Sequence, residues 1–266
     1  MAKFSTIAPA ALMRRLGMPD APCVLDVRLA EDRRDLPVVI PTTLLQTYTD
    51  LIDCIADLTG KHVVVVCDKG LKLSHGAAAY LRCMGIKAEV LDGGIRAWSA
   101  AQLPTIPLSV IPQKAPGSVW VTRNRPKIDR IACPWLIRRF IDPRAQFLFV
   151  PASEVLAVAE KYDAIAFDVP GAPWTHKGQT CTFDHLLTGF TLSTTPLERM
   201  ATVIRGADVN QHSLAPECAG LLAFSVGLSR AFPNDLEQLE ASMSLYDAFY
   251  RWARDGQGET HDWDET

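Results

Sequence analysis

Four consecutive valines, Val63 to Val66, lead directly into Cys67, and this segment constrains the fold more than any other part of the chain. An uninterrupted apolar strand is typical of a parallel sheet that is covered by helices on both faces. The residues that follow, through Lys72, include a glycine and lead into a helical pattern over Leu73 to Met84. Cys67 is therefore predicted in a loop at the carboxyl end of a strand, where open α/β sheets bind their ligands.

Short β-type runs alternate with helix-type runs along the first hundred residues. The strand patterns are CVLDV, HVVVVC and KAEVL, and helical patterns lie near Thr49 to Leu58, over Leu73 to Met84 and over Ile95 to Gln102. This order builds β–α–β units with right-handed crossovers. We predict an α/β fold in which a parallel sheet is flanked by helices.

A proline-rich stretch divides the chain. The segment LPTIPLSVIPQKAPG has no helical periodicity, which is typical of a stiff, extended connector. The predicted organisation is a first domain over residues 1–104, a linker over 105–118 and a second domain over 119–266. The second domain opens with the strand patterns VWVTR and FLFV and becomes mainly helical after Thr175. It is predicted to be α/β with a mainly helical second half.

The composition excludes several classes of protein. With 48% hydrophobic and 21% charged residues, the 266-residue chain is typical of a globular protein. It has no apolar run of the roughly 20 residues that cross a bilayer, and its start lacks a signal-peptide pattern, so we expect a cytoplasmic protein without a membrane partner. The seven cysteines lack CxxC spacing, which disfavours both a zinc ribbon and a secreted disulfide framework.

The expected position of Cys67 also indicates its chemistry. Backbone N–H groups of the loop and the positive end of the next helix favour a thiolate and can bind an anion. Lys69 and Lys72 add positive charge, whereas Asp68 opposes ionisation, and the sequence leaves open which effect dominates. Leu73 occupies the sixth position after the cysteine, where cysteine phosphatases require arginine, so phosphate ester hydrolysis is disfavoured.

Three blocks of the first domain resemble the rhodanese family: VLDVR at 24–28, the loop Cys67–Lys72, and AEVLDGGIRAWSAAQLP at 88–104. In that family the loop cysteine takes a sulfane sulfur from a donor such as thiosulfate and passes it to cyanide or a thiol, without a cofactor. The resemblance implies Cys67 as the persulfide carrier and a substrate-binding loop made of Asp68, Lys69, Gly70, Leu71 and Lys72. The alternative is a catalytically silent domain, because Asp68 stands where rhodanese loops commonly carry arginine.

The second domain carries longer motifs. The segments VTRNRPKIDRIACPWLIRRFIDPRAQFLFVP, AIAFDVPG, IRGAD, LAPECAGLLAFSVGLSR and MSLYDAFYRW resemble the chromate-resistance domain of the ChrB type over most of residues 119–254. Members of that family are associated with chromate resistance, some as chromate-responsive regulators. The resemblance implies a link to chromate and names no reaction.

Basic residues concentrate at the start of the second domain. Seven basic and two acidic residues lie between Arg123 and Arg144. Chromate is a tetrahedral dianion, and arginines beside a helix start can bind such an ion, so Arg123, Arg125 and Arg130 are predicted oxyanion ligands. The alternative is a set of solvated surface charges.

A polar segment of the second domain contains His176, Cys181 and Asp184. These residue types can ligate a soft or borderline metal ion, so a metal in the second domain is an open prediction. A hydrogen-bonded loop without a metal is the alternative.

Three hypotheses follow for the whole chain: a sulfurtransferase linked to chromate resistance, a chromate-responsive regulator with an inactive rhodanese domain, and a metal or redox-active detoxification protein. A regulator needs a DNA-reading element. The sequence has no helix-turn-helix spacing with basic recognition residues, and the chain after residue 144 is strongly acidic. Both observations disfavour a nucleic-acid partner and favour the enzyme.

Overall fold

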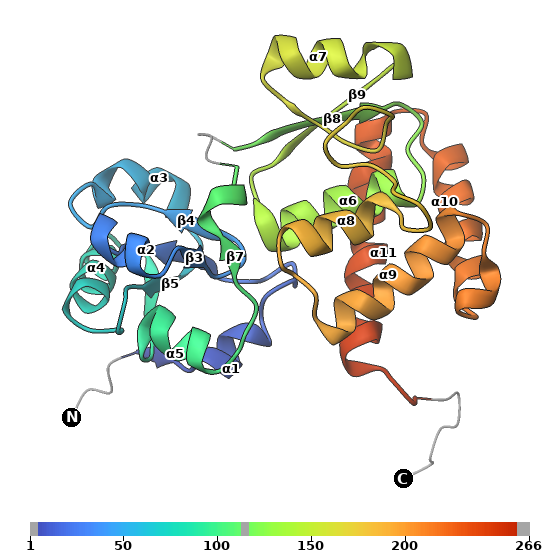
Figure 1. Cartoon of the computed structure of the whole chain (residues 1–266). Coiled ribbons are helices and arrows are strands. Elements are labelled where there is room, and N and C mark those ends of the chain that lie inside the picture. Colours follow the sequence, from blue (N-terminus) through green and yellow to red (C-terminus); the bar gives the residue numbers. More distant parts are fainter. Residues whose placement is uncertain (1–4, 113–116, 260–266) are drawn as a thin grey trace. The chain divides into compact units, whose positions relative to one another are not determined.

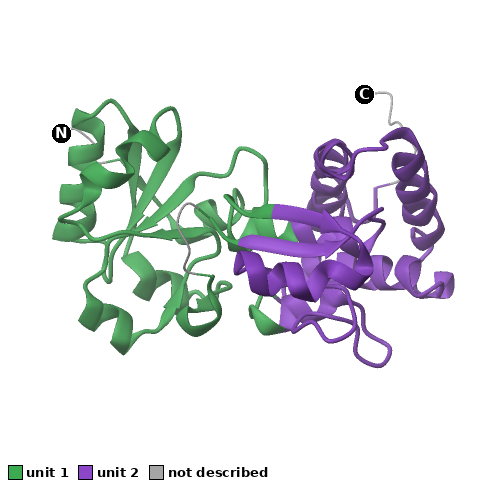
Figure 2. Cartoon of the chain, turned by 90° about the horizontal axis from the view of Figure 1, so that it is seen from above, with its two compact units in different colours: residues 1–118, 136–146, 189–192 green, residues 119–135, 147–188, 193–266 purple. Residues whose placement is uncertain are grey.

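The structure, a computed structural model, describes residues 5–112 and 117–259 and divides into two compact units. Unit 1 contains residues 1–118, 136–146 and 189–192, and unit 2 contains residues 119–135, 147–188 and 193–266. Figure 1 labels many of their elements, and Figure 2 colours unit 1 green and unit 2 purple.

Unit 1 is built on a five-stranded sheet with the order β1-β6-β5-β2-β4, in which all neighbouring strands are parallel. Its strands are β1 (Thr6–Ile7), β2 (Cys23–Asp26), β4 (Thr43–Leu45), β5 (His62–Val66) and β6 (Lys87–Leu91). Its helices are α1 (Pro9–Met13), α2 (Ala30–Asp35), η1 (Leu51–Cys54), α3 (Ile55–Leu58), α4 (Lys72–Cys83), α5 (Gly94–Ala100), η2 (Leu108–Val110) and the π-helical η3 (Ile137–Ile141). The predicted parallel α/β fold is confirmed.

The four valines of β5 are buried on both faces of this sheet. Val63 and Val65 pack in a cluster with residues of α3 and α4, and Val64 and Val66 pack in a second cluster with residues of α1 and α5. Burying each valine contributes roughly 1.5–3 kcal/mol. Helices therefore cover both faces of the central strand, and its carboxyl end is held rigidly where Cys67 begins.

A two-stranded antiparallel sheet completes unit 1. It pairs β3 (Val38–Val39) with β7 (Ile106–Pro107). The second strand lies within the proline-rich segment, and residues 113–116 of that segment lie outside the described residues.

Unit 2 combines a small sheet with a group of helices. The sheet has the order β10-β8-β9, and β10 and β8 are parallel. Its strands are β8 (Val119–Arg123), β9 (Gln146–Val150) and β10 (Ile165–Ala166). The helices are α6 (Asp129–Leu136), η4 (Ala152–Glu154), α7 (Val155–Tyr162), α8 (Thr182–Gly189), α9 (Thr195–Asp208), η5 (His212–Leu214), α10 (Cys218–Ala231) and α11 (Asp235–Asp255).

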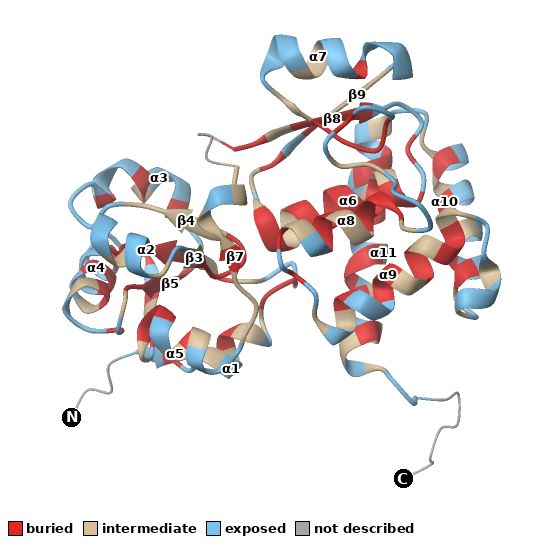
Figure 3. Cartoon of the chain, in the orientation of Figure 1, coloured by how far each residue is buried: buried red, intermediate tan, exposed pale blue. Residues whose placement is uncertain are grey.

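The helices of unit 2 differ in burial. In Figure 3, α6 is largely buried and α7 is largely exposed. Helix α7 packs its Val155 face on Val121 and Ala166 of the sheet. Helix α11 begins at a cap in which the Asn234 side chain accepts hydrogen bonds from the backbone N–H groups of Leu236 and Glu237. The mainly helical second half of this region is as predicted.

Among the residues that the structure describes, no helix combines the length and the apolar composition that a bilayer span requires.

Candidate functional site

The loop from Cys67 to Lys72 joins the end of β5 to the start of α4, as predicted. Cys67 is only 4% exposed, and its Sγ lies 3.1 Å from the Oγ of Ser74 in the first turn of α4. The Ser74 hydroxyl also donates to the carbonyl oxygen of Leu71, at 3.1 Å. A serine hydroxyl has one proton, so it can turn from that carbonyl to the sulfur when Cys67 becomes a thiolate.

Glycines fix the path of the loop. Gly70 has φ +67°, and a Cβ there would lie 2.6 Å from the carbonyl oxygen of Leu91. Gly94 has φ +61°, and a Cβ there would lie 2.3 Å from the carbonyl oxygen of Cys67. The Ile95 N–H donates to that same oxygen at 3.0 Å. The start of α5 therefore packs against the backbone of the Cys67–Lys72 loop. This contact explains why the sequence block at 88–104, which contains α5, occurs together with the cysteine loop.

Asp68 is paired with a side chain that is remote in sequence. Its Oδ1 lies 2.8 Å from the Nε of Arg96, and the Arg96 N–H donates to the Asp68 carbonyl oxygen at 3.1 Å. The Arg96 side chain is about half exposed, so the pair adds at most about 1 kcal/mol to stability. The pair matters more for the chemistry of Cys67 than for stability, because the guanidinium offsets the carboxylate charge next to Cys67.

The remaining loop side chains reach solvent. Lys69, Leu71 and Lys72 are exposed, and Leu71 retains 60% of its accessible surface. Lysines at an open loop attract small anions. The predicted loop residues therefore lie together around one buried thiol.

Asp26 and Arg28 form a buried pair next to β5. Arg28 Nη2 lies 2.7 Å from Asp26 Oδ2, and its guanidinium donates to the carbonyl oxygens of Leu36 at 3.0 Å and Val38 at 2.6 Å. Asp26 is the residue of β2 that pairs with Val66, directly before Cys67. The VLDVR block thus connects the segment that contains Leu36 and Val38 to β2, which pairs with β5, the strand that ends before Cys67.

Unit 2 contains a second cluster of polar side chains, centred on the Nε2 of His176. This nitrogen lies 3.4 Å from Asp129 Oδ2, 3.2 Å from Asp168 Oδ1 and 3.2 Å from Asp208 Oδ2. Asp129 opens α6, Asp208 closes α9, and Asp168 follows β10. Four segments of the chain therefore converge on one imidazole nitrogen.

Two of these carboxylates are held by other groups. Asp129 is fully buried and accepts hydrogen bonds from the N–H of Thr182 at 2.6 Å and of Phe183 at 3.2 Å, which begin α8. Asp168 accepts the Thr182 hydroxyl at 2.8 Å and lies 3.2 Å from Arg130 Nε. Both carboxylates are thus fixed in position.

The cluster carries an excess of negative charge. Hydrogen bonding to Asp129 and Asp168 raises the pKa of His176 to about 10. Burial and the charges of Asp129 and Asp168 raise the pKa of Asp208 to about 7. The environment therefore favours a bound positive charge at this point.

Of the three predicted metal ligands, only His176 lies in this cluster. Asp184 accepts the Cys181 N–H at 2.9 Å and pairs with Arg205 Nη1 at 2.9 Å. Cys181 is buried, and burial raises the pKa of its thiol far above the ordinary value. The aspartates of the cluster were not among the predicted ligands, although each lies within a block that carried the family resemblance: KIDRIACPW, AIAFDVPG and IRGAD.

The three predicted oxyanion ligands do not share one position. Arg130 pairs with Asp168. The pKa of Arg130 is lowered, first by burial and second by the charge of the exposed Arg123. The Arg125 N–H instead donates to both carboxylate oxygens of Asp235, at 3.2 Å, and its Nη2 donates to the Ser229 carbonyl at 3.4 Å. Arg125 is thus held at the start of α11.

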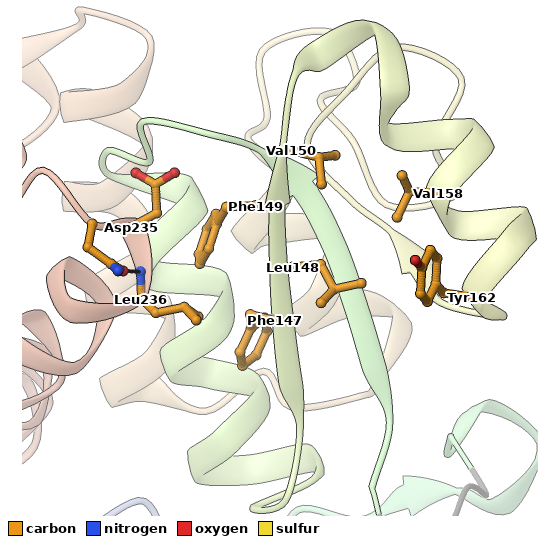
Figure 4. A pocket seen from close by; sticks show the side chains of 9 residues that line it. Phe147, Leu148, Phe149, Val150, Val158, Tyr162, Asp235 and Leu236 are labelled. Carbon is orange, nitrogen blue, oxygen red and sulfur yellow. Dashed lines mark hydrogen bonds between the residues drawn. The ribbon is translucent and has the colours of Figure 1, made fainter.

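A surface hollow of unit 2 lies between β9, α7 and the start of α11 (Figure 4). In Figure 4 Asp235 and Leu236 lie on one side of β9, and Val158 and Tyr162 lie on the other. The lining is mainly aliphatic and aromatic: Phe147, Leu148, Phe149, Val150, Val158, Tyr162, Asn234, Asp235 and Leu236. The hollow offers apolar surface, whereas the reactive side chains gather in the loop and the cluster described above.

Comparison with known proteins matches two successive regions of the chain to two families. Residues 8–101 match the family described as rhodanese-like domain, and residues 120–253 match the family described as ChrB, C-terminal domain. Protein ChrB of Cupriavidus metallidurans is 37% identical over 145 residues, which are 53% of this chain and 43% of that protein. The chain therefore matches less than half of the length of this curated relative.

Solved structures also resemble part of the chain. A thiosulfate sulfurtransferase from Pseudomonas aeruginosa is 30% identical, with 39% of this chain and 19% of that chain covered and a TM-score of 0.35. A rhodanese-like domain protein from Staphylococcus aureus is 25% identical, with 36% of this chain and 91% of that chain covered and a TM-score of 0.33.

Proposed function

Because the chain belongs to the ChrB C-terminal domain family and also contains a rhodanese-like domain, we propose that it is a sulfurtransferase that carries sulfane sulfur on Cys67 and serves chromate resistance. The observation that carries the proposal is the position of the Cys67 thiol. It lies at the end of a buried parallel strand, 3.1 Å from the Ser74 hydroxyl and at the start of a 12-residue helix. A hydroxyl and the positive end of a helix both stabilise a thiolate.

The proposed reaction has two displacement steps. The Cys67 thiolate attacks the outer sulfur of thiosulfate, the S–S bond of thiosulfate breaks, and sulfite leaves with the bonding electrons. Cyanide or a thiolate then attacks the outer sulfur of the Cys67 persulfide, and the cysteine thiolate is released. Each step exchanges one sulfur bond for another, so no cofactor is required.

The neighbouring side chains support these steps. The exposed Lys69 and Lys72 attract the thiosulfate dianion, and Arg96 offsets the charge of Asp68. The Ser74 hydroxyl can donate to the sulfur in its anionic states.

We expect the wild-type protein to form thiocyanate from thiosulfate and cyanide, and Cys67→Ser to reduce the rate to the uncatalysed background. Cys83→Ser is the matched control, since Cys83 is an exposed cysteine at the end of α4 and leaves the loop intact. Mass spectrometry of the thiosulfate-treated protein should locate one added sulfur atom on Cys67. A wild-type rate no higher than that of Cys67→Ser would exclude the proposed activity.

The proposed link to chromate rests on the family of residues 120–253. If sulfur chemistry serves resistance, a strain that depends on this protein should lose chromate resistance with Cys67→Ser and keep it with Cys83→Ser. Growth at increasing chromate concentration measures the effect. Unchanged resistance with Cys67→Ser would instead favour a chromate-responsive regulator whose rhodanese-like domain is inert.

A further inference from the structure

We propose that Asp129, His176 and Asp208, together with the adjacent Asp168, bind a divalent transition-metal ion in unit 2. One ligand atom from each of Asp129, His176 and Asp208 lies within 4.8 Å of the others. The site takes an ion that accepts both an imidazole nitrogen and carboxylate oxygens, such as Zn²⁺ or Mn²⁺. It is separate from Cys67 and does not depend on the proposed sulfur transfer.

The spacing of the atoms around His176 Nε2 matches the spacing between ligands of one metal ion. His176 Nε2 lies 3.2–3.4 Å from three carboxylate oxygens. Ligands about 2.0–2.2 Å from a tetrahedral ion are about 3.3–3.6 Å from one another. The other hydrogen bonds of the cluster range from 2.6 Å, between Thr182 N and Asp129, and 2.8 Å, between Thr182 Oγ1 and Asp168, to 3.2 Å, between Phe183 N and Asp129.

Hydrogen bonding by His176 cannot satisfy all three carboxylates. Its Nε2 carries at most one proton, and that proton is directed to one acceptor at a time. Three carboxylates therefore surround a nitrogen that can donate a well-directed hydrogen bond to only one of them. A metal ion at this point interacts with all of them at once.

The charge balance is an independent argument for a cation. When all three carboxylates are ionised they contribute −3, and Arg130, which lies 3.2 Å from Asp168, contributes +1. With a protonated His176 the sum is −1, and with a neutral His176 it is −2. A divalent ion bound to neutral His176 brings the sum to zero, so the metal replaces the imidazole proton and removes the remaining charge.

The protein holds this site rigidly on one side and leaves it open on the other. The α8 N-terminus fixes Asp129, and Thr182 and Arg130 fix Asp168. The His176 side chain is 39% exposed and that of Asp208 is 19% exposed. Buried hydrogen-bonded carboxylates orient their neighbours, and the open side admits an ion and its water ligands.

Titration calorimetry of the EDTA-treated full chain with Zn²⁺, and separately with Mn²⁺, tests the proposal. We expect one ion per chain, and a loss of affinity of at least about tenfold in His176→Ala and in Asp208→Asn. His185→Ala is the matched control, because this α8 histidine contacts Thr180 and lies outside the four-residue cluster. Circular dichroism verifies that each variant is folded.

Magnetic resonance supplies a second measurement that does not depend on the variants. Substoichiometric Mn²⁺ should broaden the ring signals of His176 in the wild-type protein before those of His62 in unit 1. Equal affinity of wild type and His176→Ala for both ions would overturn the proposal. So would equal losses in His176→Ala and His185→Ala, or equal broadening of the two histidines.

Discussion

Replacing Gly94 with alanine is expected to abolish sulfur transfer and to lower the free energy of unfolding of unit 1 by about 2–5 kcal/mol. The left-handed backbone at φ +61° costs an L-residue about 1–2 kcal/mol. The new Cβ would lie 2.3 Å from the Cys67 carbonyl oxygen and 2.5 Å from the Gly70 nitrogen, and forcing such an overpacked contact costs about 1–3 kcal/mol more. Both contacts are backbone atoms, so the loop that holds the thiol must move. Urea unfolding and thiocyanate formation measure the two effects.

Gly85→Ala is the matched control for this experiment. Gly85 also has a positive φ, of +78°, but a Cβ there meets nothing within 4 Å. The control therefore carries the backbone cost of about 1–2 kcal/mol without the collision, and it should retain sulfur transfer. Equal losses of stability and activity in the two variants would show that close packing behind the Cys67 loop is unimportant.

The sequence predicts well those parts of the fold in which the order of apolar and polar residues along a short segment indicates which side chains are buried. Four valines in succession predicted a strand covered on both faces, and alternate valines enter two separate core clusters. The helix expected over 73–84 is observed over Lys72–Cys83, because its apolar residues follow the helical period. Local pattern was sufficient in both cases, since each residue's environment depends on neighbours close in sequence.

The polar sites depend on contacts between distant segments, which local spacing does not reveal. The sequence does not show how the charge of Asp68 is balanced, because its partner, Arg96, lies 28 positions away on α5. In the sequence, His176 is followed closely by Cys181 and Asp184, which are residue types that ligate metals. In the structure it faces Asp129 and Asp208 instead, at the ends of two helices that flank its segment in sequence.

Arg28→Leu is expected to be a second strongly destabilising change, with a loss of roughly 3–5 kcal/mol of unfolding free energy. The Arg28 side chain is fully buried, and its guanidinium is the close partner of Asp26, whose side chain is only 2% exposed. Leucine removes this close positive charge and leaves the buried Asp26 carboxylate with the backbone N–H at position 28 and the more distant Arg33, whose Nε lies 3.9 Å from Asp26 Oδ1. It also removes the hydrogen bonds to the carbonyl oxygens of Leu36 and Val38. Urea unfolding measures the loss.

A double variant, Asp26→Leu with Arg28→Leu, distinguishes the cost of a buried carboxylate that has lost its close partner from the cost of lost packing. If the buried carboxylate causes most of the loss, removing it as well should recover part of the stability, so the double variant should be more stable than Arg28→Leu alone. Equal or lower stability of the double variant would mean that the hydrogen bonds to Leu36 and Val38 matter more than the charge.

The rate of sulfur transfer should rank the variants in the same order as their stability, because Asp26 pairs with Val66 and the Val27 N–H donates to the Val66 carbonyl oxygen at 2.9 Å. Loosening β2 therefore loosens the strand end from which Cys67 projects.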